Sequence, residues 1–130
     1  MRKAVFIAVL AVALAPAASN AVPAPTATIR LEHRVDSSHG FYAEGAYYYA
    51  VLRRGSVSVV RRFSGTRMTL RMPAGRYVVR SYARPCDGNC GLLDPPMDGC
   101  TARVRLTANA TTRVRIVAPP GSPCRIRIVR

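Results

Sequence analysis

The sequence of 130 residues is poor in the residue types on which most catalysis and metal binding depend. It has only two histidines, His33 and His39, and only six acidic residues. The G-x-S-x-G, H-E-x-x-H and Gly-rich phosphate-loop motifs, which mark many hydrolases, zinc peptidases and nucleotide-binding enzymes, do not occur. We therefore expect a protein that is not an enzyme and that needs no cofactor.

Long apolar runs are also missing, except for one at the start of the chain. Residues 4–15 are all Ala, Val, Leu, Ile or Phe, but this run is shorter than the roughly 20 residues that span a bilayer. Two basic residues precede it and a small-residue segment ending at Ala21 follows, an order typical of a secretory signal peptide. We expect cleavage after Ala21, a flexible arm over residues 22–27 and one domain over residues 28–130, in a secreted, extracellular protein without a transmembrane segment.

Lysine is absent after Lys3, so arginine supplies the positive charge of the expected mature chain. Without residues 1–21 the chain has 18 arginines against six acidic residues, a net charge of about +12. Such a charge favours anionic partners, although it could serve solubility alone. No nucleic-acid-binding motif is present, so we expect an anionic cell-envelope polymer or another protein as partner, and no specific nucleic acid. The sequence does not indicate the oligomeric state.

Alternating apolar and polar residues in short segments, separated by turn residues, predict strands in the domain. No segment has the 3.6-residue periodicity of a helix. Seven or eight short strands with a turn signal every eight to twelve residues favour a single small all-β antiparallel sandwich, with a small barrel as the alternative. The predicted strands cover residues 28–35, 46–53, 56–63, 66–72, 76–84, 101–107, 111–117 and 125–130.

The last three segments concentrate arginine at alternate positions. A hairpin that pairs Thr107 with Thr111 would group the apolar residues and would place Arg105 opposite Arg113. Like charges facing each other across strands are unfavourable, and guanidinium groups match phosphate, sulfate and carboxylate. The alternative is a solvated outer face with no ligand. The candidate anion-binding residues are Arg103, Arg105, Arg113, Arg115, Arg125 and Arg127, and Tyr42, Tyr47, Tyr48 and Tyr49 could add stacking.

Four cysteines, Cys86, Cys90, Cys100 and Cys124, are expected to form two disulfides in an exported chain. The hairpin above would bring Cys100 and Cys124 to the same end of the sheet, which favours pairing Cys100 with Cys124 and Cys86 with Cys90. A zinc site is not expected because a second close cysteine pair is missing. A calcium site is not expected because the ligand order D-x-[DN]-x-[DN]-G fails and no Glu closes the loop.

The segment between Cys86 and Cys100 also allows an alternative function. A proline-rich loop that disulfides hold in place could be presented to a secreted protease in the manner of an inhibitor, with Leu92 and Leu93 as anchors. The same loop could equally be structural, as a stapled connection between two strands.

Two stretches resemble known families. "LRMPAGRYVVRSY", residues 70–82, resembles the Leu-x-x-Pro-x-Gly-x-Tyr segment of prealbumin-like sandwich domains, such as collagen-adhesin B-type and carboxypeptidase-regulatory-like domains. The resemblance implies that Pro73 and Gly75 form a turn and that Tyr77 packs in the core. The isopeptide bonds of some adhesin domains require lysine, which the expected mature chain lacks. "RPCDGNCGLLDPPMDGC", with the later "CRI", is similar to small exported actinobacterial proteins, which implies export and a sandwich but no activity.

Overall fold

Eight β-strands form the protein, as a computed structural model of residues 22–35, 45–86, 90–119 and 123–130 shows. No helix occurs in these ranges. The expected signal peptide lies outside them. The first strand starts at Thr26, so the last two residues of the expected arm, 22–27, belong to a strand instead. The strands are β1 (Thr26–Val35), β2 (Ala46–Arg54), β3 (Val57–Arg62), β4 (Arg67–Pro73), β5 (Gly75–Pro85), β6 (Met97–Leu106), β7 (Thr111–Ala118) and β8 (Arg125–Val129).

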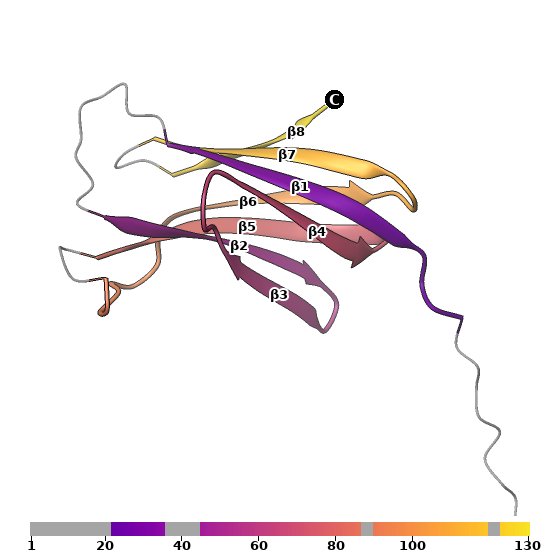
Figure 1. Cartoon of the computed structure of the whole chain (residues 1–130), viewed down its shortest axis with the longest axis horizontal. Helices are drawn as coiled ribbons and strands as arrows, with labels where there is room; N and C mark the ends of the chain where they lie inside the picture. Colours follow the sequence, from indigo (N-terminus) through magenta and orange to yellow (C-terminus); the bar gives the residue numbers. More distant parts are fainter. Residues whose placement is uncertain (1–21, 36–44, 87–89, 120–122) are drawn as a thin grey trace, which may run out of the picture.

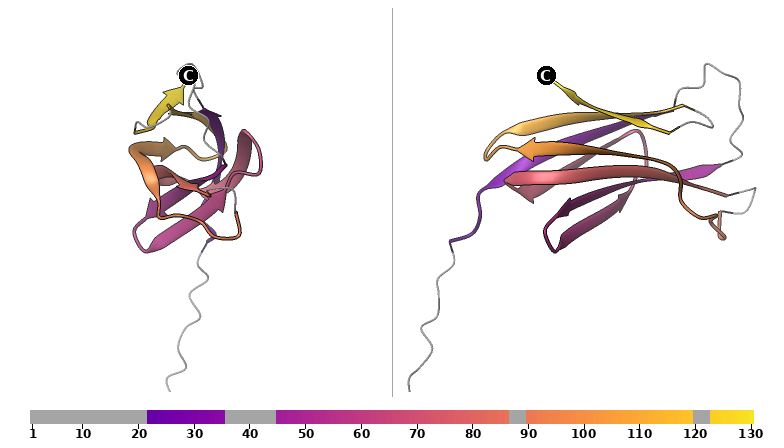
Figure 2. Two further views of the ribbon diagram at one scale, coloured as in Figure 1. Left: turned by 90° about the vertical axis from the view of Figure 1, so that its left-hand side faces the viewer. Right: turned by 180° about the vertical axis from the view of Figure 1, so that it is seen from behind.

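The strands build a sandwich of two four-stranded sheets, which can be followed in Figures 1 and 2. Sheet A has the order β4-β1-β7-β8, and sheet B has the order β3-β2-β5-β6. All pairs are antiparallel except β1 and β7, which run parallel. The all-β sandwich predicted from the alternating pattern is therefore confirmed, and one parallel pair at the centre of sheet A is added to it.

The core lies between the sheets and is filled by alternate residues of β1 and β7 in sheet A and of β2, β5 and β6 in sheet B. Alternation of side chains on a strand puts these residues on one face and the intervening arginines on the other. Sheet A contributes Ile29, Leu31, Val114 and Ile116, and sheet B contributes Leu52, Val79, Val104 and Leu106, all nearly inaccessible to solvent. Burial of such aliphatic side chains, each contributing roughly 1.5–3 kcal/mol, is the main force that holds the sheets together.

The turn between β4 and β5 has the geometry that the resemblance to prealbumin-like domains implied. Gly75 has a φ of 151°, and a Cβ atom there would lie 2.6 Å from the Arg54 guanidinium. Tyr77 is buried, and its hydroxyl donates a hydrogen bond of 2.8 Å to the carbonyl oxygen of Pro73. The tyrosine thereby satisfies its polar atom inside the core and fixes the turn.

The connection between β6 and β7 differs from the predicted hairpin. β6 pairs with β5 in sheet B and β7 pairs with β1 and β8 in sheet A, so the chain crosses from one sheet to the other between them. Asn109 has the left-handed φ of 57° expected for this loop. The backbone N–H of Asn109 donates a hydrogen bond to the carbonyl oxygen of Thr26, and the backbone N–H of Thr28 donates one to the carbonyl oxygen of Ala110. These bonds to β1 hold β7 beside the first strand instead of beside β6.

β2 and β3 form a hairpin with a two-residue turn. Arg54 pairs with Val57, which leaves Gly55 and Ser56 as the turn, and Leu52 pairs with Val59. Gly55 has a φ of 55°, the left-handed conformation that such tight turns need and that glycine adopts without strain.

Two disulfides connect the favoured cysteine pairs, Cys86 with Cys90 and Cys100 with Cys124, with Cα–Cα distances of 4.7 and 5.1 Å. The second joins β6 of sheet B to the residue before β8 of sheet A, so it is a covalent link between the two sheets. The β6–β7 hairpin that was expected to bring Cys100 and Cys124 together does not form. The pair forms because β6 and β8 lie at corresponding edges of the facing sheets.

Candidate anion-binding faces

The six arginines predicted to form one ladder are divided between the two sheets. Arg103 and Arg105 lie on β6 in sheet B, whereas the other four lie on β7 and β8 in sheet A. The expected opposition of Arg105 to Arg113 is wrong, because β6 and β7 do not pair. The sandwich therefore presents arginine on two opposite outer faces.

The outer face of sheet A contains more arginines than the sequence indicated. Four belong to β7 and β8, and four more come from β1 and β4, which the pairing brings alongside. The strands of this sheet contain one acidic residue, Glu32. We call this surface the arginine face, and its arginines are Arg30, Arg34, Arg67, Arg71, Arg113, Arg115, Arg125 and Arg127.

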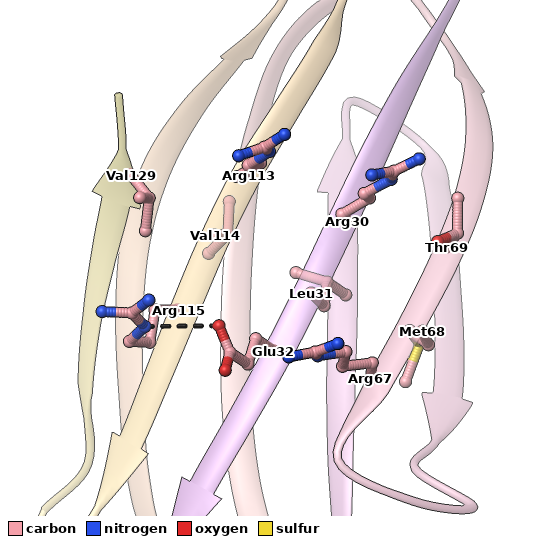
Figure 3. A pocket seen from close by; sticks show the side chains of 10 residues that line it. All are labelled: Arg30, Leu31, Glu32, Arg67, Met68, Thr69, Arg113, Val114, Arg115 and Val129. Atoms are coloured by element: carbon pink, nitrogen blue, oxygen red, sulfur yellow. Dashed lines mark hydrogen bonds and ion pairs between the residues drawn. The ribbon is translucent and has the colours of Figure 1, made fainter.

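The strand register arranges the centre of the arginine face in rows. Arg30 on β1 is the direct partner of Arg113 on β7, and the next row along the strands contains Arg67, Glu32, Arg115 and Arg127. Neighbouring strands are about 4.8 Å apart, and residues that point the same way along a strand are about 6.6 Å apart. Figure 3 shows Arg30 and Arg113 side by side, with Glu32 one step further between Arg67 and Arg115.

Glu32 neutralises only part of this charge. Its carboxylate accepts from Arg34 at 2.8 Å and from the Nε atom of Arg115 at 3.3 Å. The hydrogen bond from Arg34 is the main reason why the pKa of Glu32 is lowered, and Arg115 adds to the shift. Among the residues that the structure describes, Arg30 and Arg113 have no carboxylate partner, so this pair carries uncompensated charge.

The arginine face is hollowed rather than flat. A depression of about 420 Å³ lies over the centre of sheet A, where Arg30, Arg67, Arg113 and Arg115 surround it and Val129 forms part of its wall. Such a depression can hold a charged group within reach of several guanidinium groups at once.

The outer face of sheet B combines arginine with tyrosine. Tyr49 and Tyr82 stack with ring centroids 5.1 Å apart. The Arg62 guanidinium lies over the ring of Tyr47 at 4.6 Å, and Arg80 lies over Tyr82 at 5.6 Å. Tyr47 and Tyr49, which were expected to stack on a ligand, therefore stack on side chains of the protein itself. Tyr48 instead contacts His33 from the other side of the strand, and Tyr42 lies outside the described residues.

The loop between the cysteines is attached to the end of β5. Arg84 donates hydrogen bonds of 2.9 Å to the carbonyl oxygen of Asp94 and 3.0 Å to that of Leu93. The N–H of Asp94 bonds the carbonyl oxygen of Pro85 at 2.9 Å. Leu92 is 75% exposed, whereas Leu93 is partly covered. Residues 87–89 lie outside the described part of the chain.

His33 occupies an interior position, and among the described residues no acid–base partner lies beside it. It is 4% exposed, and its ring packs against Tyr48 and Phe63. In the described part of the molecule its Nε2 atom has no hydrogen-bond partner, and burial lowers its pKa to about 4. His39 lies in the undescribed residues 36–44. All four cysteines are in disulfides, which removes the ligands of a zinc site.

Within the described ranges no group of three or more His, Cys, Asp or Glu side chains could hold a metal ion. In the same ranges, no helix has the length and apolar character needed to cross a membrane.

Comparisons of the chain with protein-family models, curated proteins and solved structures found no match. The resemblance to prealbumin-like domains and to exported actinobacterial proteins therefore remains a prediction from the sequence.

Proposed function

We propose that this protein is a secreted, non-enzymatic binding module that docks on an anionic polymer of the cell envelope through the arginine face. The observation that carries the proposal is the direct pairing of Arg30 with Arg113 at the centre of a face with eight arginines and one glutamate. The expected signal peptide and the two disulfides support a location outside the cytoplasm.

The arrangement favours an extended ligand that carries repeated phosphate groups. Each guanidinium presents a planar fork of donors that matches two phosphate oxygens. Arginines that are direct partners, such as Arg30 with Arg113 and Arg115 with Arg127, are about 4.8 Å apart, and the successive arginines of β7 and of β8 are about 6.6 Å apart, so successive groups of a flexible phosphodiester chain can be contacted together. The unfavourable opposition of Arg30 and Arg113 is relieved when an anion lies between them, and this relief adds to the affinity.

A binding experiment with a poly(glycerol phosphate) teichoic acid attached to a sensor surface tests the proposal. We expect the affinity to fall steeply with salt, as binding by counterion release requires. The double variant R30Q/R113Q should weaken binding roughly fivefold, because two exposed ionic contacts of about 0.5 kcal/mol each are lost.

The matched control is R61Q/R130Q, which removes the same charge from exposed positions outside the arginine face. It should change the affinity by less than about twofold. Equal weakening in both variants would show that net charge alone is responsible and would contradict the proposal. Stronger binding to single-stranded DNA or to anionic vesicles than to the polymer would contradict the assigned partner.

A second candidate function rests on the exposure of Leu92 in a loop that Arg84 and the Cys86–Cys90 disulfide hold in place. Such preorganisation lowers the entropic cost of binding, and we propose inhibition of a secreted protease as the alternative to polymer docking. Assays of secreted proteases at micromolar protein should then show inhibition that the variant Leu92→Asp loses. The absence of inhibition by the unmodified protein would eliminate this candidate.

A further inference from the structure

The outer face of sheet B has its own set of arginines, on the opposite side of the molecule from the arginine face. Alternation along the strands points them away from the core, as it does on sheet A. The acidic residue in the four strands of this sheet is Asp98, near the start of β6. We call this surface the second face, and its arginines are Arg53, Arg62, Arg76, Arg80, Arg103 and Arg105.

The second face repeats the central feature of the arginine face. Arg76 on β5 is the direct partner of Arg105 on β6, and Arg103 lies one step further along β6 opposite Val78. A shallow depression lies between these strands and is lined by Arg76, Arg103 and Arg105. In the described residues no carboxylate pairs with any of these three arginines. Two like charges are thus held side by side at a hollow, as at Arg30 and Arg113.

Tyrosine rings orient two further guanidinium groups of the second face. Arg62 lies over Tyr47, and Arg80 lies over Tyr82, which in turn stacks on Tyr49. A guanidinium that lies over a ring still has its N–H groups available for hydrogen bonds. These contacts limit the conformations of the two side chains before a ligand arrives, which lowers the entropic cost of binding an anion.

The two faces cannot be served by one short stretch of ligand. They are the outer surfaces of two sheets that pack face to face, at a spacing of about 10 Å between the backbones. The whole core lies between them. Each face therefore contacts its own segment of polymer.

We propose that a single copy of this protein binds two polymer chains, one on each face, and so cross-links an anionic phosphate polymer of the envelope. This proposal rests on the proposed function, and it adds that each protein molecule has two separate binding sites for the polymer. The cross-link requires no oligomer, because the opposite outer faces of one sandwich supply both sites.

A sandwich-capture assay tests the proposal with the full mature chain. The poly(glycerol phosphate) teichoic acid is attached to a surface, the protein is loaded and free protein is washed away. Fluorescently labelled polymer of the same kind is then added. We expect the unmodified protein to capture label, and light scattering at the loading concentration to give the mass of a monomer.

Variants on each face separate the two sites. R30Q/R113Q and R76Q/R105Q should both still load on the surface through their intact face, and each should capture at most about one third of the label per loaded protein. R61Q/R130Q, which removes equal charge elsewhere, should capture nearly as much as the unmodified protein. The combination R30Q/R113Q/R76Q/R105Q should lose most of both loading and capture.

The outcomes distinguish failure of cross-linking from failure of docking. If the unmodified protein loads but captures no label, the cross-linking proposal is overturned and the docking function stays in place. Loss of all loading in R30Q/R113Q would have the same meaning, because it would show that the second face alone does not bind the polymer. Capture by a dimer with a mass of two chains would also overturn it. No loading of the unmodified protein would contradict the docking function itself.

Discussion

At the scale of single residues, His33 lies in an environment that is unfavourable for a charge. It is enclosed by Tyr48 and Phe63, its Nε2 atom has no partner among the described residues, and burial lowers its pKa to about 4. The neutral imidazole behaves as an apolar side chain, whereas the protonated form would bring an unpaired charge into the end of the core.

The stability of the protein should therefore depend on the protonation of His33. The folded-state pKa of about 4 lies below the unfolded value of 6.5, so the unfolded state binds more protons between these pH values. The stabilisation is present above pH 6.5 and is lost as the pH falls through about 4. We expect the free energy of unfolding to decrease by about 3 kcal/mol from pH 7 to pH 4. Urea denaturation followed by circular dichroism at both pH values measures this decrease.

The variant His33→Leu serves as the control, because it fills the site without a titratable group. Its unfolding free energy should change much less over the same pH range. If His33→Leu kept the full pH dependence of the unfolding free energy, the carboxylates and not His33 would be its cause.

The direction of individual side chains could largely be predicted from the sequence. The alternation in residues 28–35 places Ile29, Leu31, His33 and Val35 on one side. The structure buries the first three and leaves Val35, at the end of the strand, 48% exposed. The role of Tyr77 followed from a short motif, because the turn chemistry of Pro73 and Gly75 is local. Such inferences succeed because the two-residue period of a strand is a property of each strand alone.

At the scale of strands, the pairing could not be predicted in the same way. Several of the later segments have the same alternation of arginine with Val, Ile or Leu, so β7 matches β1, β6 and β8 almost equally well by pattern. The choice of β1 depends on contacts distant in sequence, including the bonds that Thr26 and Thr28 make to the loop before β7. This is why Arg30 and Arg67 were absent from the predicted site, and why Arg103 and Arg105 were placed on the wrong face.

The parallel pairing of β1 with β7 also brings Glu32 beside Arg115, and this contact leads to a prediction. The Glu32 carboxylate bonds Arg34 and Arg115 and repels an approaching anion. Glu32→Gln frees both guanidinium groups, so we expect teichoic-acid affinity to rise by roughly threefold, the size of effect that an exposed ion pair carries. The measurement is the sensor titration at low salt.

Asp94→Asn is the matched variant for Glu32→Gln, since it removes the same charge from an exposed position in the loop before β6. It should leave the affinity nearly unchanged. An equal gain in both variants would point to net charge and against a specific effect of Glu32 on the arginine face.

At the scale of the whole molecule, the two disulfides have different structural roles. Cys86 and Cys90 are separated by 4 residues and close a local loop, whereas Cys100 and Cys124 are separated by 24 and join the two sheets. Loop-closure entropy predicts a larger effect for the longer loop.

Replacement of each pair with alanine should reveal this difference. We expect loss of the Cys100–Cys124 bond to lower the unfolding free energy by roughly 3.5 kcal/mol, and loss of Cys86–Cys90 by roughly 2 kcal/mol. Denaturant titration of the two double variants measures both values. A larger effect of the Cys86–Cys90 bond would mean that the loop near Arg84 contributes more to stability than the link between the sheets.

The parallel pair at the centre of sheet A has a consequence for the order of assembly. The direct partner of Thr28 on β7 is Thr111, and its partner on β4 is Arg71, so both neighbours of the first strand are distant from it in sequence. The β2–β3 hairpin of sheet B needs only a two-residue turn. Because distant contacts form slowly, we expect pulsed hydrogen exchange during refolding to protect amides of the β2–β3 hairpin before those of β1. If the chain is exported N-terminus first, as the proposed function requires, sheet A would be completed only after β7 and β8 have followed β1 across the membrane.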